Sequence, residues 1–224
     1  LQNRPFTLKG DMGEYTCDAL IIATGASAKY LGLPSEEQFA GRGVSACATC
    51  DGFFYKNKEV AVLGGGDTAI EEALYLANIC SRVYIIHRRD EFRAAPVTLE
   101  KARANAKIEF ITSATIKQAY GDKAGLTGLI INTKDGERDL KVPGIFVFVG
   151  LNVNNDVLRQ ENGEFLCDME AGGQVSVDLK MQTSVPGLFA AGDIRKDAPK
   201  QVIVAAGDGA VAALSALSYI ESLH

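Results

Sequence analysis

The stretch from Glu59 to Asp90, "EVAVLGGGDTAIEEALYLANICSRVYIIHRRD", decides the fold of this chain. An apolar run at Val60–Leu63 leads into three glycines. Apolar residues then recur at helical spacing over 70–77, and a second apolar run follows at Val83–Ile86. This order predicts a buried strand, a glycine turn, a helix and a second strand within roughly 30 residues. Such a strand–helix–strand unit is typical of α/β folds.

The glycine turn between the first strand and the helix has the spacing G-x-G-x-x-A. Gly64 permits the tight turn, Gly66 lets the backbone approach a pyrophosphate, and Ala69 keeps the helix close to the strand. The helix begins near Asp67 and Thr68, where free N–H groups are available to an anion. Three glycines can also form an ordinary turn. Because these follow a strand and open a helix, they favour a dinucleotide-binding site.

The residues after the second strand indicate which dinucleotide is bound. An NAD site has an acidic residue there, which holds the ribose 2′-hydroxyl. This chain instead has His87 followed by Arg88, Arg89 and Arg93. Guanidinium groups bind a 2′-phosphate through charge-assisted, often bidentate hydrogen bonds. A basic run is often only a solvated face, and His87 can be a packed strand-end residue. The position of the arginines at the end of the strand nevertheless favours NADP(H).

The overall composition is that of a soluble globular protein, with 47% hydrophobic and 23% charged residues. The net charge of −5 argues against a general nucleic-acid or anionic-membrane binder. We expect no membrane span, because Gly207, Asp208 and Gly209 interrupt the longest apolar segment, at 202–220. We expect no signal peptide, and the five cysteines are an odd number. Both features favour a cytoplasmic protein over a secreted disulfide framework.

Two of the cysteines, Cys47 and Cys50, are closely spaced in "ACATCDGFF" (residues 46–54). A zinc site would need a second pair or suitably spaced histidines, which the sequence lacks, so we expect no metal. A structural disulfide across two residues would restrict the unfolded chain little. A redox-active pair fits better, because one thiol attacks while its neighbour resolves the product. Asp51 is placed to exchange a proton with the leaving thiolate.

A redox disulfide beside an NADP(H) site implies a flavin. NADPH delivers a hydride, and a flavin normally stands between it and a disulfide. The segments "IIATG" (Ile21–Gly25) and "GLFAAGDI" (Gly187–Ile194) each place an apolar strand before a turn of small residues. In the second segment, Asp193 is placed to hold a sugar or ribityl hydroxyl. Either segment alone would be an ordinary strand end, so they support a flavin site only in combination.

These motifs together resemble the bacterial-type, low-molecular-weight thioredoxin reductases. The resemblance runs along essentially the whole chain, through "ATG", "CATCDG", "GGGDTA", "HRRDEFRA", "GLFAAGDI" and "KQVIVAAGDGA". It implies the two-domain α/β fold of pyridine nucleotide-disulfide oxidoreductases, doubly wound in character. A Rossmann-like NADPH domain at residues 30–151 is inserted in an FAD domain made of residues 1–29 and 152–224. It further implies a homodimer that acts on thioredoxin.

The same resemblance implies roles for individual residues. Cys47 and Cys50 become the redox pair, and Asp51 becomes the catalytic acid. The ligands of the 2′-phosphate become Arg88, Arg89 and Arg93. FAD is expected to contact six positions: Thr24, Gly25, Gly192, Asp193, Gln201 and Val202.

One part of the family's sequence pattern has no counterpart in this sequence. The family begins with a strand, a glycine turn and a helix that bind the FAD pyrophosphate, and no such turn precedes Gly64. The sequence also starts at Leu1 without an initiator Met. We therefore expect a piece of a longer protein, which binds FAD weakly by itself. The expected activity is NADPH-dependent reduction of thioredoxin disulfide. Two alternatives are an NADP(H)-binding fragment without turnover and the flavoprotein subunit of alkyl hydroperoxide reductase.

Overall fold

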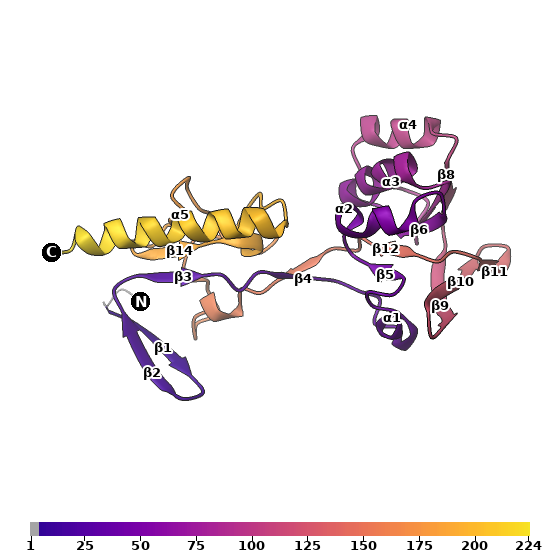
Figure 1. The fold of residues 1–224 in the computed structure, drawn as a ribbon. Helices are drawn as coiled ribbons and strands as arrows, with labels where there is room; N and C mark the ends of the chain where they lie inside the picture. Colours follow the sequence, from indigo (N-terminus) through magenta and orange to yellow (C-terminus); the bar gives the residue numbers. More distant parts are fainter. Residues whose placement is uncertain (1–4) are drawn as a thin grey trace. The chain divides into compact units, whose positions relative to one another are not determined.

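The computed structural model describes residues 5–224, and the opening residues, on which the expectation of a longer protein partly rests, lie outside that range. The chain forms two compact units (Figure 1). We call residues 28–150 the inserted unit, and the segments up to Ser27 and from Leu151 onward the flanking unit. The chain passes between the units twice. The two passing segments pair with each other as the short strands β4 (Ala26–Ala28) and β13 (Leu151–Val153).

The inserted unit is built on a five-stranded parallel sheet with the order β5-β12-β6-β7-β8. Its strands are β5 (Val44–Ser45), β6 (Glu59–Leu63), β7 (Arg82–Ile86), β8 (Ile108–Ile111) and β12 (Ile145–Val147). Helix α3 (Asp67–Ile79) joins β6 to β7. The strand, turn, helix and strand predicted from the sequence are therefore confirmed, and they occupy the centre of the sheet.

The two faces of this sheet are covered differently. Side chains alternate along a strand, so Val60 and Val62 pack against the helices while Ala61 and Leu63 face the other way. The helical face carries α3 together with α2 (Ala48–Asp51), η1 (Gly52–Tyr55) and α4 (Pro96–Ala104). The opposite face packs against an antiparallel sheet of β9 (Thr115–Asp122), β10 (Gly125–Thr133) and β11 (Gly136–Leu140), and α1 (Pro34–Gln38) contacts β9.

The flanking unit is assembled from both ends of the described chain. Its elements are β1 (Phe6–Gly10), β2 (Gly13–Cys17), β3 (Leu20–Ile22), η2 (Asp156–Leu158), β14 (Leu188–Ala190), η3 (Gly192–Ile194) and α5 (Val202–Glu221). Strands β1 and β2 form an antiparallel hairpin, and β3 pairs in parallel with β14. Ile21 on β3 is exposed, and the polar stretch after Gly150 contains β13 and η2.

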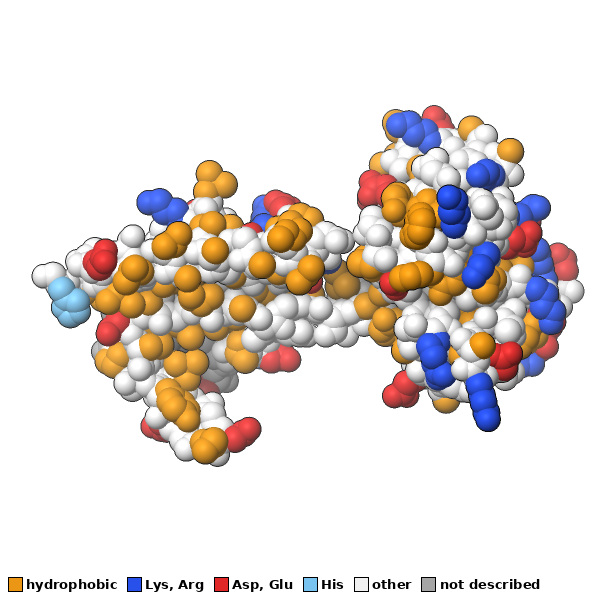
Figure 2. Space-filling model, viewed as in Figure 1, with side chains coloured by type: hydrophobic (Ala, Val, Ile, Leu, Met, Phe, Trp, Pro, Cys, Tyr) orange, Lys and Arg blue, Asp and Glu red, His pale blue; other side chains and the backbone are white. Residues whose placement is uncertain are grey.

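Helix α5 corrects the expectation that no segment could span a membrane. By length and composition it is the one helix among the described residues that could do so, because Gly207, Asp208 and Gly209 do not interrupt it. Hydrophobic side chains gather along the helix in Figure 2, and Val202, Ile203 and Leu214 are among the exposed ones. The core helix of a soluble protein passes the same test, so length and composition alone do not place α5 in a membrane.

The acid in the middle of α5 ties the helix to its own unit. Asp208 is only 6% exposed and lies on a buried stripe with Ala212 and Ala216. Its carboxylate accepts hydrogen bonds from Arg195 Nε at 2.5 Å and Nη2 at 3.0 Å, and from the Gly192 N–H at 3.2 Å. A buried charge is costly unless it is paired in this way. The bidentate pair therefore fixes α5 against the turn that follows β14.

We predict that Asp208→Ala weakens the packing of α5, because it leaves the Arg195 guanidinium half-enclosed without its partner. Removing one member of a buried ion pair costs on the order of 3 kcal/mol. Hydrogen–deuterium exchange of peptides from α5 measures the effect, with peptides from α3 in the other unit as the internal control. Native exchange rates in α5 of the variant would contradict the prediction.

Candidate active site

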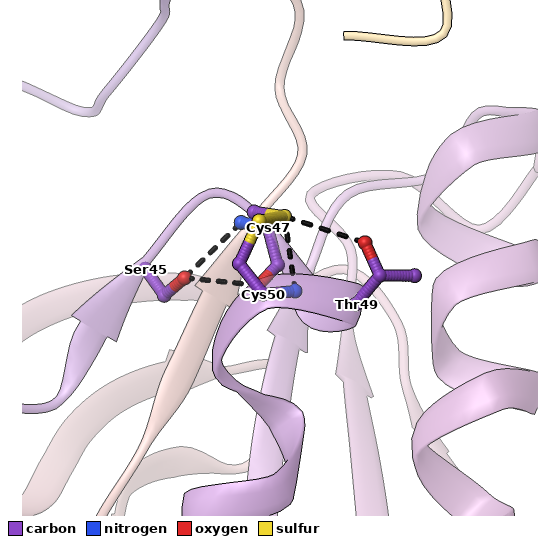
Figure 3. Close-up of a disulfide and its surroundings, with 4 residues drawn as sticks. All are labelled: Ser45, Cys47, Thr49 and Cys50. Atoms are coloured by element: carbon purple, nitrogen blue, oxygen red, sulfur yellow. Dashed lines mark hydrogen bonds between the residues drawn. A yellow bond between two sulfur atoms is a disulfide. The ribbon is translucent and has the colours of Figure 1, made fainter. Parts of the chain in front are cut away.

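The closely spaced cysteines lie at the start of the short helix α2 (Figure 3). Cys47 is the N-cap residue of this helix and forms a disulfide with Cys50. Ser45, the last residue of β5, fixes the backbone in front of the pair, because its hydroxyl oxygen accepts a hydrogen bond from Cys47 N–H at 3.1 Å. The disulfide is therefore held directly after an edge strand of the parallel sheet.

The two sulfur atoms have different surroundings. Cys47 Sγ accepts a hydrogen bond from Cys50 N–H at 3.1 Å and lies 3.4 Å from Thr49 Oγ1 (Figure 3). Cys47 is half-buried, whereas Cys50 is exposed. Once the disulfide is reduced, the N–H of Cys50 and the hydroxyl of Thr49 are placed to stabilise negative charge on Cys47 Sγ.

The residues that follow the cysteines combine an acid with exposed aromatic rings. Asp51 is half-buried, and its N–H donates to the Cys47 carbonyl at 3.2 Å. Burial, and secondarily the Asp51 carboxylate, raises the pKa of Tyr55. Phe53 and Phe54 are 71% and 72% exposed. A disulfide, an acid and two exposed rings thus share one surface of the inserted unit.

The glycine turn after β6 has the shape that a phosphate group requires. Gly64 has a φ of +152°, and a Cβ there would come within 2.7 Å of the Ala69 Cβ. A Cβ on Gly66 would meet nothing within 4 Å, so open space lies in front of it. Gly66 is the N-cap of α3, and no side chain of the described chain caps this helix. The free N–H groups at 67–69 therefore fit a pyrophosphate.

The arginines predicted to bind a 2′-phosphate lie beside this turn. We call residues 88–95 the arginine loop. Because β6 and β7 are parallel, their carboxyl ends meet at one edge of the sheet. The loop is joined to the turn at two points: Arg93 N–H donates to Gly65 O at 2.8 Å, and Ala95 N–H donates to Asp67 Oδ1 at 2.7 Å. The Asp67 carboxylate is thus engaged by the loop, while the N–H groups at the start of the helix are the part of the motif predicted to bind the anion.

The three guanidinium groups of this loop are free to bind an anion. Arg88, Arg89 and Arg93 are all exposed, and none of them has an ion-pair partner within residues 5–224. Three unpaired positive charges beside an uncapped helix N-terminus fit the two phosphate positions of NADP(H).

His87 closes the space between the turn and the loop. It is 8% exposed, its Nε2 lies 3.1 Å from Glu91 O, and its ring lies 4.9 Å from that of Phe92. A Cβ on Gly65 would come within 2.3 Å of the ring. Burial lowers the pKa of His87, the hydrogen bond to Glu91 opposes this effect, and the nearby arginines lower the pKa further. His87 therefore packs between the turn and the loop, where burial favours the neutral form of its ring.

The flanking unit brings together the residues predicted to contact FAD. Thr24 and Gly25 follow β3, and Gly192 and Asp193 follow β14; because these strands are parallel, both turns lie at the same edge. Gly192 has a φ of +78° and approaches α5. The remaining two positions begin that helix: Gln201 is its N-cap and Val202 its first residue.

Two residues that position this edge were missed in the sequence. Asn154 holds the turn after β3, because its side-chain amide donates to Thr24 O at 2.9 Å and its N–H donates to Gly25 O at 3.0 Å. Arg195 holds Asp208, as described above. For Arg195 the available signal was Asp208, a lone acid in an Ala-rich helix, because such an acid suggests a buried, positively charged partner. Nothing in the sequence pointed to Asn154.

The comparisons with known proteins agree with this geometry. The pyridine nucleotide-disulphide oxidoreductase family matches residues 2–209. A thioredoxin reductase from Helicobacter pylori is 58% identical over 96% of this chain, and the chain covers 70% of that relative. The chain belongs to the thioredoxin reductase family. A solved thioredoxin reductase from Giardia duodenalis matches with a TM-score of 0.89 at 37% identity, over 98% of this chain and 72% of that structure.

One relative in the thioredoxin reductase family carries a different name. A glucosaminate ammonia-lyase from Pseudomonas fluorescens is 49% identical over 99% of this chain, and the chain covers 70% of it. Similarity at this level therefore identifies the family and its disulfide-bearing fold.

We predict that Cys47 and Cys50 cycle between disulfide and dithiol while the other three cysteines stay reduced. Burial raises the pKa of Cys80 and of Cys167 to about 11, so few thiolates form at these positions. After mild reduction, iodoacetamide should modify Cys47 and Cys50 in the native protein, and Cys80 and Cys167 only after unfolding. Peptide mass mapping measures this. A disulfide to Cys17, or zinc retained in stoichiometric amount, would contradict it.

We also predict that stability falls as the pH drops below 6.5. The folded pKa of His87 lies below its ordinary value of 6.5, so the unfolded chain takes up a proton first. The stabilisation is complete above pH 6.5 and is lost as the pH falls toward the folded pKa. NMR titration of the imidazole signals should give a midpoint below 6.5 for His87, and His224→Gln identifies the signals. A midpoint at or above 6.5 would show that His87 is not packed as a neutral ring.

Proposed function

We propose that this protein is an NADPH-dependent flavoprotein that reduces the disulfide of thioredoxin. The observation that carries the proposal is the inserted unit itself. One parallel sheet presents a solvent-accessible disulfide after β5 and, after β6 and β7, a glycine turn with three unpaired arginines. The family membership and the thioredoxin reductases among the relatives support the same reaction.

In this proposal the inserted unit binds NADPH and the flanking unit binds FAD. The N–H groups at the start of α3 hold the pyrophosphate, and Arg88, Arg89 and Arg93 hold the 2′-phosphate. The turns at 24–25 and 192–193, together with Gln201 and Val202, contact FAD. When bound, the two cofactors supply a hydride from NADPH and a carrier that passes its two electrons to the disulfide.

The residues of this chain then carry out thiol–disulfide exchange. Two electrons and two protons convert the Cys47–Cys50 disulfide to a dithiol. One thiolate attacks a sulfur of the substrate disulfide and forms a mixed disulfide. The second cysteine attacks that bond, which restores the Cys47–Cys50 disulfide and releases the substrate as a dithiol. Asp51 is the proposed proton donor to the leaving thiolate, since it follows Cys50 directly.

Assembly and location form part of the same proposal. The exposed apolar side chains of α5 favour an assembly in which another surface covers them. Because the resemblance to the family implies a homodimer, we propose that a second copy of this chain covers them. The free thiols of Cys17, Cys80 and Cys167 favour a reducing compartment, and we propose the cytoplasm.

The decisive experiment measures NADPH oxidation by the full-length protein with thioredoxin disulfide as the acceptor. We expect turnover that Cys47→Ser or Cys50→Ser abolishes while NADPH binding persists. Cys17→Ser serves as a matched control and should keep native turnover. Oxidation that requires a hydroperoxide, or release of ammonia from glucosaminate without NADPH, would replace the proposed reaction by one of the alternatives. Binding of NADPH without any turnover would leave only a binding module.

A further inference from the structure

The arginine loop contains an acid that does not pair with the arginines. Asp90 follows Arg88 and Arg89 directly, yet its carboxylate is bound elsewhere. Lys134 Nζ donates to Asp90 Oδ1 at 3.0 Å and to Oδ2 at 2.9 Å, and Ser113 Oγ donates to Oδ1 at 2.7 Å. The carboxylate is thereby occupied by groups from outside the loop.

Lys134 and Ser113, two of the groups that hold Asp90, come from separate segments. Lys134 lies in the turn between β10 and β11, and Ser113 lies between β8 and β9. Ser113 adopts a φ of +47°, which is unusual for a residue other than glycine, and its N–H donates to Arg89 O at 3.3 Å. The Ser113 hydrogen bond, followed by those from Lys134, lowers the pKa of Asp90. The acid is therefore held, as a carboxylate, by contacts that converge on it from two segments.

A released Asp90 would interfere with a phosphate in two ways. Its carboxylate could pair with the guanidinium of a neighbouring arginine, and it would repel the phosphate directly. It would also supply an acidic group in the region where NAD sites place one for the 2′-hydroxyl. Both effects weaken the binding of a nucleotide with a 2′-phosphate and leave the binding of a nucleotide without that phosphate unchanged.

We propose that Lys134 is a specificity-determining positioning residue, which holds Asp90 away from Arg88, Arg89 and Arg93 and so leaves them free for the 2′-phosphate of NADPH. The proposal rests on the proposed function. Lys134 and Asp90 are 63% and 59% exposed, so their pair contributes little to folding stability. Its contribution is to the choice of nucleotide.

The test is calorimetric titration of NADPH and NADH into the native chain and its variants. Lys134→Met should weaken NADPH binding by about fivefold, the size expected for one unit charge at contact distance in water, and leave NADH binding nearly unchanged. Adding Asp90→Asn to Lys134→Met should restore most of the lost affinity, because the released side chain is then neutral. Arg88→Ala provides a positive control for loss of a phosphate ligand.

A matched control separates positioning from the loss of a positive charge. Lys117 lies on β9 of the same antiparallel sheet and pairs with Glu137, so Lys117→Met removes an equal charge without releasing Asp90. It should leave the preference for NADPH intact. Equal weakening of both nucleotides by Lys134→Met, no rescue by Asp90→Asn, or the same effect from Lys117→Met would overturn the role of Lys134. A native chain that binds both nucleotides equally would overturn the NADPH assignment, and the role of Lys134 with it.

Discussion

The close approach of backbone and side chains at the end of β6 is the constraint on which the inserted unit depends. Gly64 has room for no side chain because Ala69 and the carbonyl of Phe148 lie against it, and Gly65 has none because of the His87 ring. These contacts bring the start of α3 and the end of β7 to one place. Any Cβ there would push apart the helix and the arginine loop. The shape of the phosphate site is thus a consequence of packing between neighbouring elements of the sheet.

Hydrogen bonds to other donors keep the acids at this edge of the sheet from pairing with the arginines. Asp67 is occupied by the N–H of Ala95, and Asp90 by Lys134 and Ser113. Within the described chain the three guanidinium groups therefore keep their full charge, although acids lie nearby in the sequence. The result is a concentrated positive field on a loop that is already held in position.

Much of this could be predicted from the sequence because the signals are local. The alternation of apolar strand, glycine turn and periodic helix lies within one segment, and the spacing of Cys47 and Cys50 is visible by itself. The features that escaped prediction join distant residues. Lys134 reaches an acid 44 positions earlier, and Asn154 reaches the turn after β3 across 130 positions. The expectation that Asp208 interrupts the apolar segment at 202–220 was wrong, because Arg195 pairs with Asp208 inside a continuous helix.

The disulfide and the glycine turn occupy equivalent positions on one parallel sheet. Both follow the carboxyl ends of parallel strands, with only β12 between β5 and β6, so they share an edge and are separated by roughly two strand spacings, about 10 Å. In each case the strand leads to a residue that caps a helix, Cys47 for α2 and Gly66 for α3.

The N–H groups at the two caps face different partners. At Cys47 a backbone N–H points at a sulfur that becomes negative on reduction. At Gly66 the N–H groups have no side-chain acceptor and face open space. Two helix N-termini at one edge of the sheet therefore provide for two anions, a thiolate and a phosphate, and the side chain at the cap decides which one: a cysteine supplies its own anion, and a glycine leaves room for one that is bound.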